Sequence, residues 1–91
     1  MKKFTKKQRH DIYVRALEIL KSGALTSDCI CYALDAATDD TPEVTCVDGA
    51  MEKFYPEIYK QRPEHGRSFW WPEGDIEPRI NALETAIKQT E

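Results

Sequence analysis

The order of apolar and polar positions predicts a long helix near the N-terminus. Apolar residues recur there at three- and four-residue spacing, as Ile12, Tyr13, Ala16, Leu17 and Leu20. This spacing brings them to one face of a helix over about residues 6 to 22. Thr5 followed by Gln8 can form a capping box at its start, and Gly23 can take the left-handed conformation that ends it.

Two further helices are predicted in the middle of the chain. Thr26 or Ser27 caps the second helix. Its expected core positions are Cys29 or Ile30, Ala33, Leu34 and Ala37. Thr41 caps the third helix, which should end near Tyr55. The β-branched residues between positions 44 and 47 leave a short extended piece open as an alternative at its start.

Between Pro56 and Pro78 the chain is rich in proline and aromatic residues, which predicts an ordered loop after one more helical turn at 56–60. The last helix follows a cap at Asp75 or Glu77, and Pro78 is tolerated in its first turn. Its expected apolar stripe is Ile76, Ile80, Leu83 and Ile87. The chain is therefore expected to be all-α: one domain over residues 1–91, a small bundle of about four helices with a proline- and aromatic-rich loop before the last helix.

Charge is distributed unevenly along the chain. The net charge is −3, yet the first nine residues contain five of the 13 Lys and Arg residues, namely Lys2, Lys3, Lys6, Lys7 and Arg9. Between Ser22 and Glu52 there are seven acidic residues and no Lys or Arg. We expect these regions to be solvated faces that attract each other within or between chains, and residues 1–5 could form a flexible basic arm. Nucleic-acid binding is not expected, because such domains are usually basic overall.

The sequence contains no recognisable catalytic motif. A glycine-rich phosphate loop, H-E-x-x-H and G-x-S-x-G are absent, so we expect neither an enzyme nor a bound cofactor. Cys29 and Cys31 lie two positions apart in a helical pattern and point to different faces, which argues against a metal site. Three cysteines without an export signal indicate a reducing cytoplasm. No apolar stretch approaches the ~20 residues that span a bilayer.

Aromatic residues are concentrated before the last helix. Six of the nine lie between Phe54 and Trp71, interleaved with basic side chains. Phe54 and one tryptophan are expected in the core, but two adjacent tryptophans in an extended loop cannot easily both face inward. One of them, with Arg67, is therefore a candidate for an exposed anchor. The predicted binding surface consists of Arg62, His65, Arg67, Trp70, Trp71 and Arg79.

Several short pieces, in order, resemble short open reading frames of bacteriophages and prophages. They are Cys29-Ile30-Cys31-Tyr32-Ala33-Leu34, Phe54-Tyr55-Pro56-Glu57, Arg62-Pro63-Glu64, Phe69-Trp70-Trp71-Pro72, and Pro78-Arg79-Ile80 with Leu83 and Ile87. The resemblance covers about residues 29 to 87. It implies a setting, since small phage accessory proteins of this kind often bind a host factor stoichiometrically, including components of host defence.

Together these observations and the resemblance predict a non-catalytic phage accessory protein in the cytoplasm of the host bacterial cell, which engages or inhibits a host protein such as a component of host defence. Two alternatives remain open. One is a homo-oligomeric binder that sequesters a nucleotide signalling molecule, with a tryptophan stacked on the base and guanidinium groups on the phosphate. The other is a structural component of the virion.

Overall fold

A computed structural model describes residues 4–23, 30–38, 48–61 and 77–91. These residues contain five helices and no strand, which confirms the predicted all-α class. The helices are α1 (Lys6–Ser22), α2 (Ile30–Ala37), α3 (Asp48–Phe54), α4 (Pro56–Tyr59) and α5 (Glu77–Gln89). The expected caps at Thr26, Ser27 and Thr41, and the expected loop from 62 to 76, lie outside the described residues.

The ends of α1 are fixed by the residues that the sequence pattern indicated. Thr5 Oγ1 accepts a hydrogen bond from the Gln8 backbone N–H at 3.2 Å, and Gln8 Oε1 accepts one from the Thr5 N–H at 2.8 Å. The capping box is thus confirmed. At the other end Gly23 has a φ of 69°, and its N–H donates to the Leu20 carbonyl oxygen. A side chain at this position would be strained, which explains the glycine.

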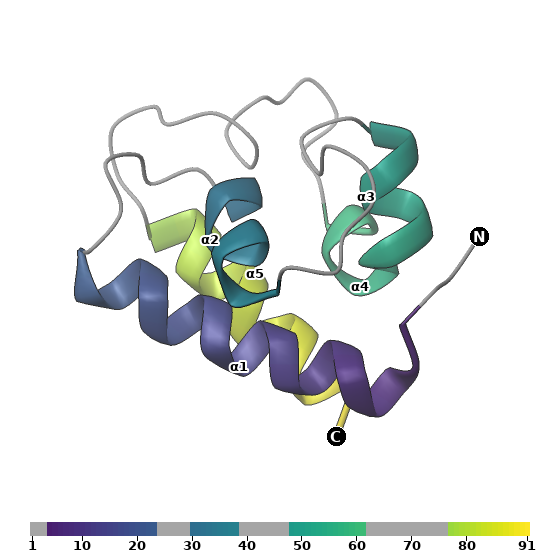
Figure 1. The fold of residues 1–91 in the computed structure, drawn as a ribbon, viewed down its shortest axis with the longest axis horizontal. Helices are drawn as coiled ribbons and strands as arrows, with labels where there is room; N and C mark the ends of the chain where they lie inside the picture. Colours follow the sequence, from purple (N-terminus) through teal and green to yellow (C-terminus); the bar gives the residue numbers. More distant parts are fainter. Residues whose placement is uncertain (1–3, 24–29, 39–47, 62–76) are drawn as a thin grey trace.

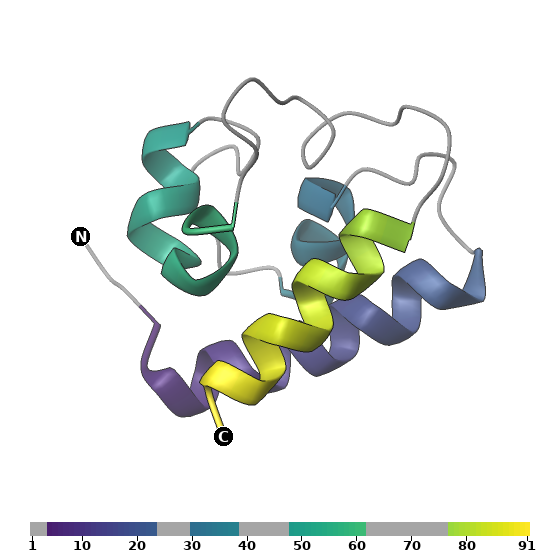
Figure 2. The same cartoon turned by 180° about the vertical axis from the view of Figure 1, so that it is seen from behind.

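Helix α1 lies along one side of the molecule, and α2 and α5 both pack against it (Figure 1). Helices α3 and α4 form a second group beside the first half of α1. Helix α5 crosses α1 so that the C-terminus of the chain lies near the start of α1 (Figure 2). The two helices therefore run roughly antiparallel.

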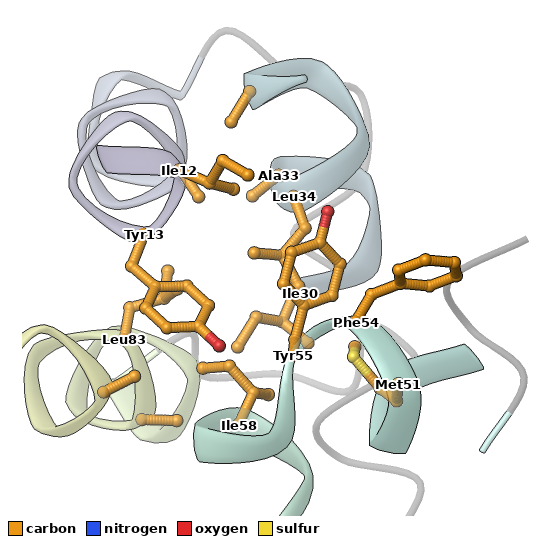
Figure 3. Packing of buried hydrophobic residues seen from close by; sticks show 14 of the residues in the cluster. Ile12, Tyr13, Ile30, Ala33, Leu34, Met51, Phe54, Tyr55, Ile58 and Leu83 are labelled. Atoms are coloured by element: carbon orange, nitrogen blue, oxygen red, sulfur yellow. The ribbon is translucent and has the colours of Figure 1, made fainter. Parts of the chain in front are cut away.

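The core lies where these elements meet. Tyr13, Tyr55, Ile58 and Leu83 converge from α1, the α3–α4 junction, α4 and α5 (Figure 3). The expected core positions of α2 are confirmed from Ile30 onward. Several alanines are buried in the core, and their side chains occupy little space between the helices. They are Ala16, Ala33, Ala37, Ala50, Ala82 and Ala86. Small side chains at these places permit close approach of the helices.

Phe4 joins this core from the end of the chain. Its ring lies 5.8 Å from the Phe54 ring and 5.8 Å from the Tyr55 ring, measured between centroids. The burial expected for Phe54 is confirmed. Phe4 and Thr5 are thus part of the folded domain, since one is packed in the core and the other caps α1.

The core-facing side of α5 differs from the expected stripe. Arg79, Ala82, Leu83 and Ala86 are buried, whereas Ile80 and Ile87 are only partly buried at the edge of the core. Leu17 of α1 is likewise partly buried. Leu83 of the expected stripe is fully buried, Ile80 and Ile87 pack against the core, and Ile76 lies outside the described residues. The buried face is wider than the spacing of large apolar residues indicated, because it also includes Arg79, Ala82 and Ala86.

A proline separates α3 from α4. Tyr55 has φ −133° and ψ 63°, outside the helical region, and Pro56 occupies the first position of α4. Proline disfavours the helical conformation in the residue before it, so α3 ends at Phe54 and a new helical turn starts. The short helix expected at 56–60 is confirmed, and the third helix ends where it was expected.

Candidate functional site

Most of the predicted binding surface lies outside the described residues: Arg62, His65, Arg67, Trp70 and Trp71. The sixth predicted residue, Arg79, belongs to the first turn of α5. Its side chain is buried, with 1% of the residue exposed to solvent. The Arg79 guanidinium is therefore enclosed by the protein and is not a surface group in this structure.

The two flanks of the segment 62–76 are joined to each other by Gln61. The Gln61 side-chain amide donates to the Glu57 carbonyl oxygen of α4 and to the Ala82 carbonyl oxygen of α5, both at 3.0 Å. Gln61 is the residue before this segment, and Glu77, just after it, starts α5. The Gln61 side chain therefore joins α4, which precedes the segment, to the second turn of α5, which follows it.

Helix α4 is in turn tied to α1 by an ion pair. Arg9 Nε and Nη2 donate to the two carboxylate oxygens of Glu57 at 2.8 and 2.9 Å. A third donor, Arg9 Nη1, reaches the Phe4 carbonyl oxygen at 2.8 Å. The side chains are 17% and 15% exposed for Arg9 and Glu57, so solvent screens the pair only weakly.

Tyr13 completes this cluster. Its hydroxyl donates to Glu57 Oε1 at 2.9 Å. Burial, reinforced by the neighbouring Glu57 charge, raises the pKa of the Tyr13 hydroxyl. Burial alone would also raise the pKa of Glu57, but the hydrogen bonds from Arg9 and Tyr13 outweigh it and hold that pKa below its usual value. The hydrogen bond to Glu57 raises the pKa of Arg9.

These shifts define what the cluster of Arg9, Tyr13 and Glu57 does. Each group is stabilised in the protonation state that it already has at neutral pH, so the cluster is poorly suited to exchanging protons there. Two Arg9 donors and the Tyr13 hydroxyl bind Glu57 and so link α1 to α4, while the third Arg9 donor binds the Phe4 carbonyl oxygen. The cluster is a structural joint that attaches α4 to α1.

The sequence gives little signal for this joint. Arg9 was assigned to the basic N-terminal region and Glu57 was not singled out, because 48 positions separate them. An ion pair between helices depends on tertiary packing, which local spacing does not encode. The aromatic residues Phe4, Tyr13 and Tyr55 were the one indication in the sequence. Their rings pack together and shield the ion pair from water, but they do not identify its two partners.

A second polar contact links α1 to the end of the chain. Thr90 Oγ1 donates to the Ala86 carbonyl oxygen at 2.8 Å, so its only hydrogen is used. The 3.1 Å contact between His10 Nδ1 and Thr90 Oγ1 therefore has the imidazole Nδ1–H as donor. Beside it lies an open hollow of about 480 Å³, lined by Lys6, Lys7, His10, Asp11, Thr90 and Glu91.

The described residues offer no group of three or more His, Cys, Asp or Glu side chains placed to hold a metal ion. Of the cysteines, Cys29 and Cys46 lie outside the described residues, and Cys31 lies in α2. None of the helices in the described part of the chain is both long and apolar enough to cross a bilayer.

The described residues form a small all-α protein whose helices are held together by buried aromatic rings and by the shielded Arg9–Glu57 ion pair. Comparisons with protein-family models, with curated proteins and with solved structures found no match to this chain.

Proposed function

We propose that this chain is a non-catalytic binding protein that recognises a host protein during phage infection, and that the segment 62–76 carries its binding surface. The observation that carries the proposal is the Gln61 junction. It ties the flanks of a segment rich in Trp and Arg to each other and to the core. Recognition residues are often found on segments that a rigid scaffold holds at both ends.

Fixed flanks favour binding for an energetic reason. Ordering a segment on association costs conformational entropy, and this cost is smaller when the ends of the segment are already fixed. The Arg9–Glu57 pair holds α4, and Gln61 joins α4 to α5. The two elements that flank the segment are therefore attached to the rest of the protein by contacts that do not involve the proposed binding residues.

The residue types in the segment favour a protein partner. Trp and Arg are enriched among the residues that dominate protein–protein binding energies. The resemblance to short phage open reading frames supplies the setting, a host factor bound stoichiometrically. The proposed contact residues are Arg62, His65, Arg67, Trp70 and Trp71. Arg79 is not among them, because its side chain is enclosed.

The test is a comparison of matched variants. Wild type, Arg67→Ala, Trp70→Ala and Trp71→Ala are each used to capture partners from a bacterial lysate, and proteins and small molecules are both identified by mass spectrometry. The control is Lys60→Ala, because Lys60 is exposed and lies next to the segment. Thermal midpoints are measured for every variant, so that loss of fold is separated from loss of binding.

We expect one host protein to be retained in a fixed ratio. Its affinity, titrated with purified partner, should fall by about tenfold or more in Arg67→Ala and in one tryptophan variant, as for an interface anchor. Lys60→Ala should bind like wild type. Full affinity in all three segment variants would contradict the proposal. Retention of a nucleotide that free phosphate displaces would favour the sequestration alternative instead.

A further inference from the structure

Helices α1 and α5 together present a face to solvent that is separate from the Gln61 junction. Near one end of this face His10 contacts Thr90, and towards the other Lys21 Nζ lies 3.6 Å from Glu84 Oε2. An early residue of α1 thus meets a late residue of α5, as expected for antiparallel helices. A groove of about 380 Å³ runs between them, lined by Leu17, Glu84, Ile87, Lys88 and Glu91.

The side of α1 beside this groove carries a regular pattern. His10, Val14, Leu17 and Lys21 recur at spacings of four, three and four residues, which keeps them on one helical face. Val14 and Leu17 are partly buried. His10 and Lys21 flank this apolar pair on the same face. The exposed Lys6 and Lys7 add positive charge near His10.

The side of α5 beside the groove carries the same spacing with the opposite charge. Ile80, Glu84, Ile87 and Glu91 alternate between isoleucine and glutamate at spacings of four, three and four residues. Both isoleucines are partly buried and both glutamates are exposed. Lys88 of α5 and Asp11 of α1 are exceptions to this pattern, since Lys88 lines the groove and Asp11 lines the hollow beside Lys6 and Lys7. The other charged residues named on this face are acidic on α5 and basic on α1.

We propose that this face binds a second copy of the chain, forming a symmetric dimer whose two-fold axis runs along the groove between α1 and α5. Rotation about such an axis packs α1 of one copy antiparallel against α5 of the other. It leaves the coordinate of every residue along the groove unchanged. Each residue of α1 then meets, in the partner, the α5 residue that it neighbours in its own chain. Leu17 meets the partner's Ile87, and Lys21 meets the partner's Glu84.

Charge argues for a second copy as the occupant. Lys21 and Glu84 form one ion pair within the chain, yet their side chains remain 52% and 48% exposed. Both groups retain room for a second partner of opposite charge. In the dimer each Glu84 lies between two lysines and each Lys21 between two glutamates, a network in place of an isolated pair. Lys6 and Lys7 similarly approach the partner's Glu91.

The size of the face sets the strength of the dimer. A 13-residue α5 is about 20 Å long, and two adjacent helices are together about 20 Å wide, so each copy covers roughly 400 Å². The total of roughly 800 Å² is below the ~1,200 Å² of most stable specific interfaces. The dimer is therefore reversible, depends on protein concentration, and weakens with salt because charges surround its apolar centre.

The decisive experiment uses charge reversal in two separate chains. Lys21→Glu gives a face whose positions 21 and 84 are both negative, and Glu84→Lys gives one in which both are positive. Each variant alone should sediment as a monomer at concentrations where wild type is dimeric. A mixture of the two should form a heterodimer, because every contact across the axis is again between opposite charges. Native mass spectrometry identifies the mixed species.

Glu52→Lys serves as the matched control, because Glu52 is exposed on α3, away from this face, and its reversal should leave the dimer unchanged. Circular dichroism and thermal midpoints establish that each single variant folds. The neutral variants Lys21→Gln and Glu84→Gln repeat the test with a smaller perturbation and should weaken the dimer. A wild-type chain that stays monomeric at high concentration overturns the proposal, as does a mixture that fails to associate. Binding of a different protein to this face, without self-association, also overturns it.

Discussion

Arg9 and Glu57 lie 48 positions apart, and both hydrogen bonds between the guanidinium and the carboxylate are shorter than 3 Å. The pair spans the contact between α1 and the four-residue α4. A helix of one turn has little stability of its own, because the conformational entropy lost in forming the first turn exceeds the stabilisation from its few hydrogen bonds. Helix α4 therefore depends on this joint and on the burial of Ile58.

Replacing Arg9 by methionine should lower the free energy of unfolding by about 1–3 kcal/mol, because Glu57 would keep a largely buried carboxylate without its main partner. Urea denaturation measures the change. Lys7→Met is the control on the same helix, since Lys7 is exposed. The double variant Arg9→Met with Glu57→Gln should recover part of the loss. Equal effects of Arg9→Met and Lys7→Met would show that the joint contributes nothing.

The joint also predicts a dependence of stability on acid pH. The pKa of Glu57 is lowered in the folded protein, so the unfolded chain binds the proton more readily than the folded one. Stability from Glu57 is therefore complete above the ordinary glutamate pKa of about 4.3 and is lost as the pH falls through the folded value. Glu57→Gln should flatten this part of the curve, measured as unfolding free energy against pH. An unchanged slope would rule out Glu57 as its source.

Tyr13 predicts the opposite behaviour at alkaline pH. Its pKa is raised on folding, so the contribution of its hydroxyl is complete below the ordinary tyrosine pKa of about 10 and is lost above it. Tyr13→Phe should remove the alkaline loss that Tyr13 causes. At neutral pH it should cost about 1.5–3 kcal/mol, because a hydrogen bond to a charged group disappears. A Tyr13→Phe chain that loses stability at alkaline pH as steeply as wild type would rule out Tyr13 as the source of that loss.

The sequence correctly predicted those features that are determined by residues close together in the chain. The capping box of Thr5 and Gln8, the Gly23 end of α1 and the turn after Pro56 depend on neighbouring residues, and all three are confirmed. The inward face of α2 followed from spacing and is confirmed from Ile30 onward. Such features are encoded within a few positions, so one sequence suffices to find them.

What the sequence missed depends on tertiary contacts. Arg79 was expected in the binding surface at the start of the last helix, but its side chain is buried there. The burial of Ala82 and Ala86 beside Leu83 was also missed, because alanine carries little weight in a pattern of large apolar residues. The Gln61 bonds to Glu57 and Ala82 join elements whose arrangement no local pattern encodes. The five remaining candidate residues, including Arg67 and both tryptophans, stay a prediction.

Gly23 gives a test of local backbone strain. Gly23→Ala should destabilise the chain by about 1 kcal/mol, since a side chain at a φ of 69° is strained even with nothing within 4 Å of the new Cβ atom. Gly23→Asn should cost less, because asparagine tolerates this conformation better than alanine. Thermal unfolding of the two variants measures the difference. If both lose the same stability, strain at this position is not the cause.

Gln61 allows the scaffold and the proposed recognition role to be tested together. Gln61→Met keeps the length of the side chain and removes the amide that joins α4 to α5. Stability should fall by about 0.5–1.5 kcal/mol, because the hydrogen bonds to the two carbonyl oxygens are lost. If segment 62–76 binds a partner, the same change should weaken that binding further, because the flanks are no longer fixed and more entropy is lost on association. Affinity and unfolding free energy are therefore measured on the same preparation, below the temperature at which the variant begins to unfold. Lys60→Met provides the matched control, since Lys60 is an exposed neighbour. If Gln61→Met binds the partner as tightly as Lys60→Met does, fixed flanks are not part of recognition, and the surface must be sought elsewhere on the molecule.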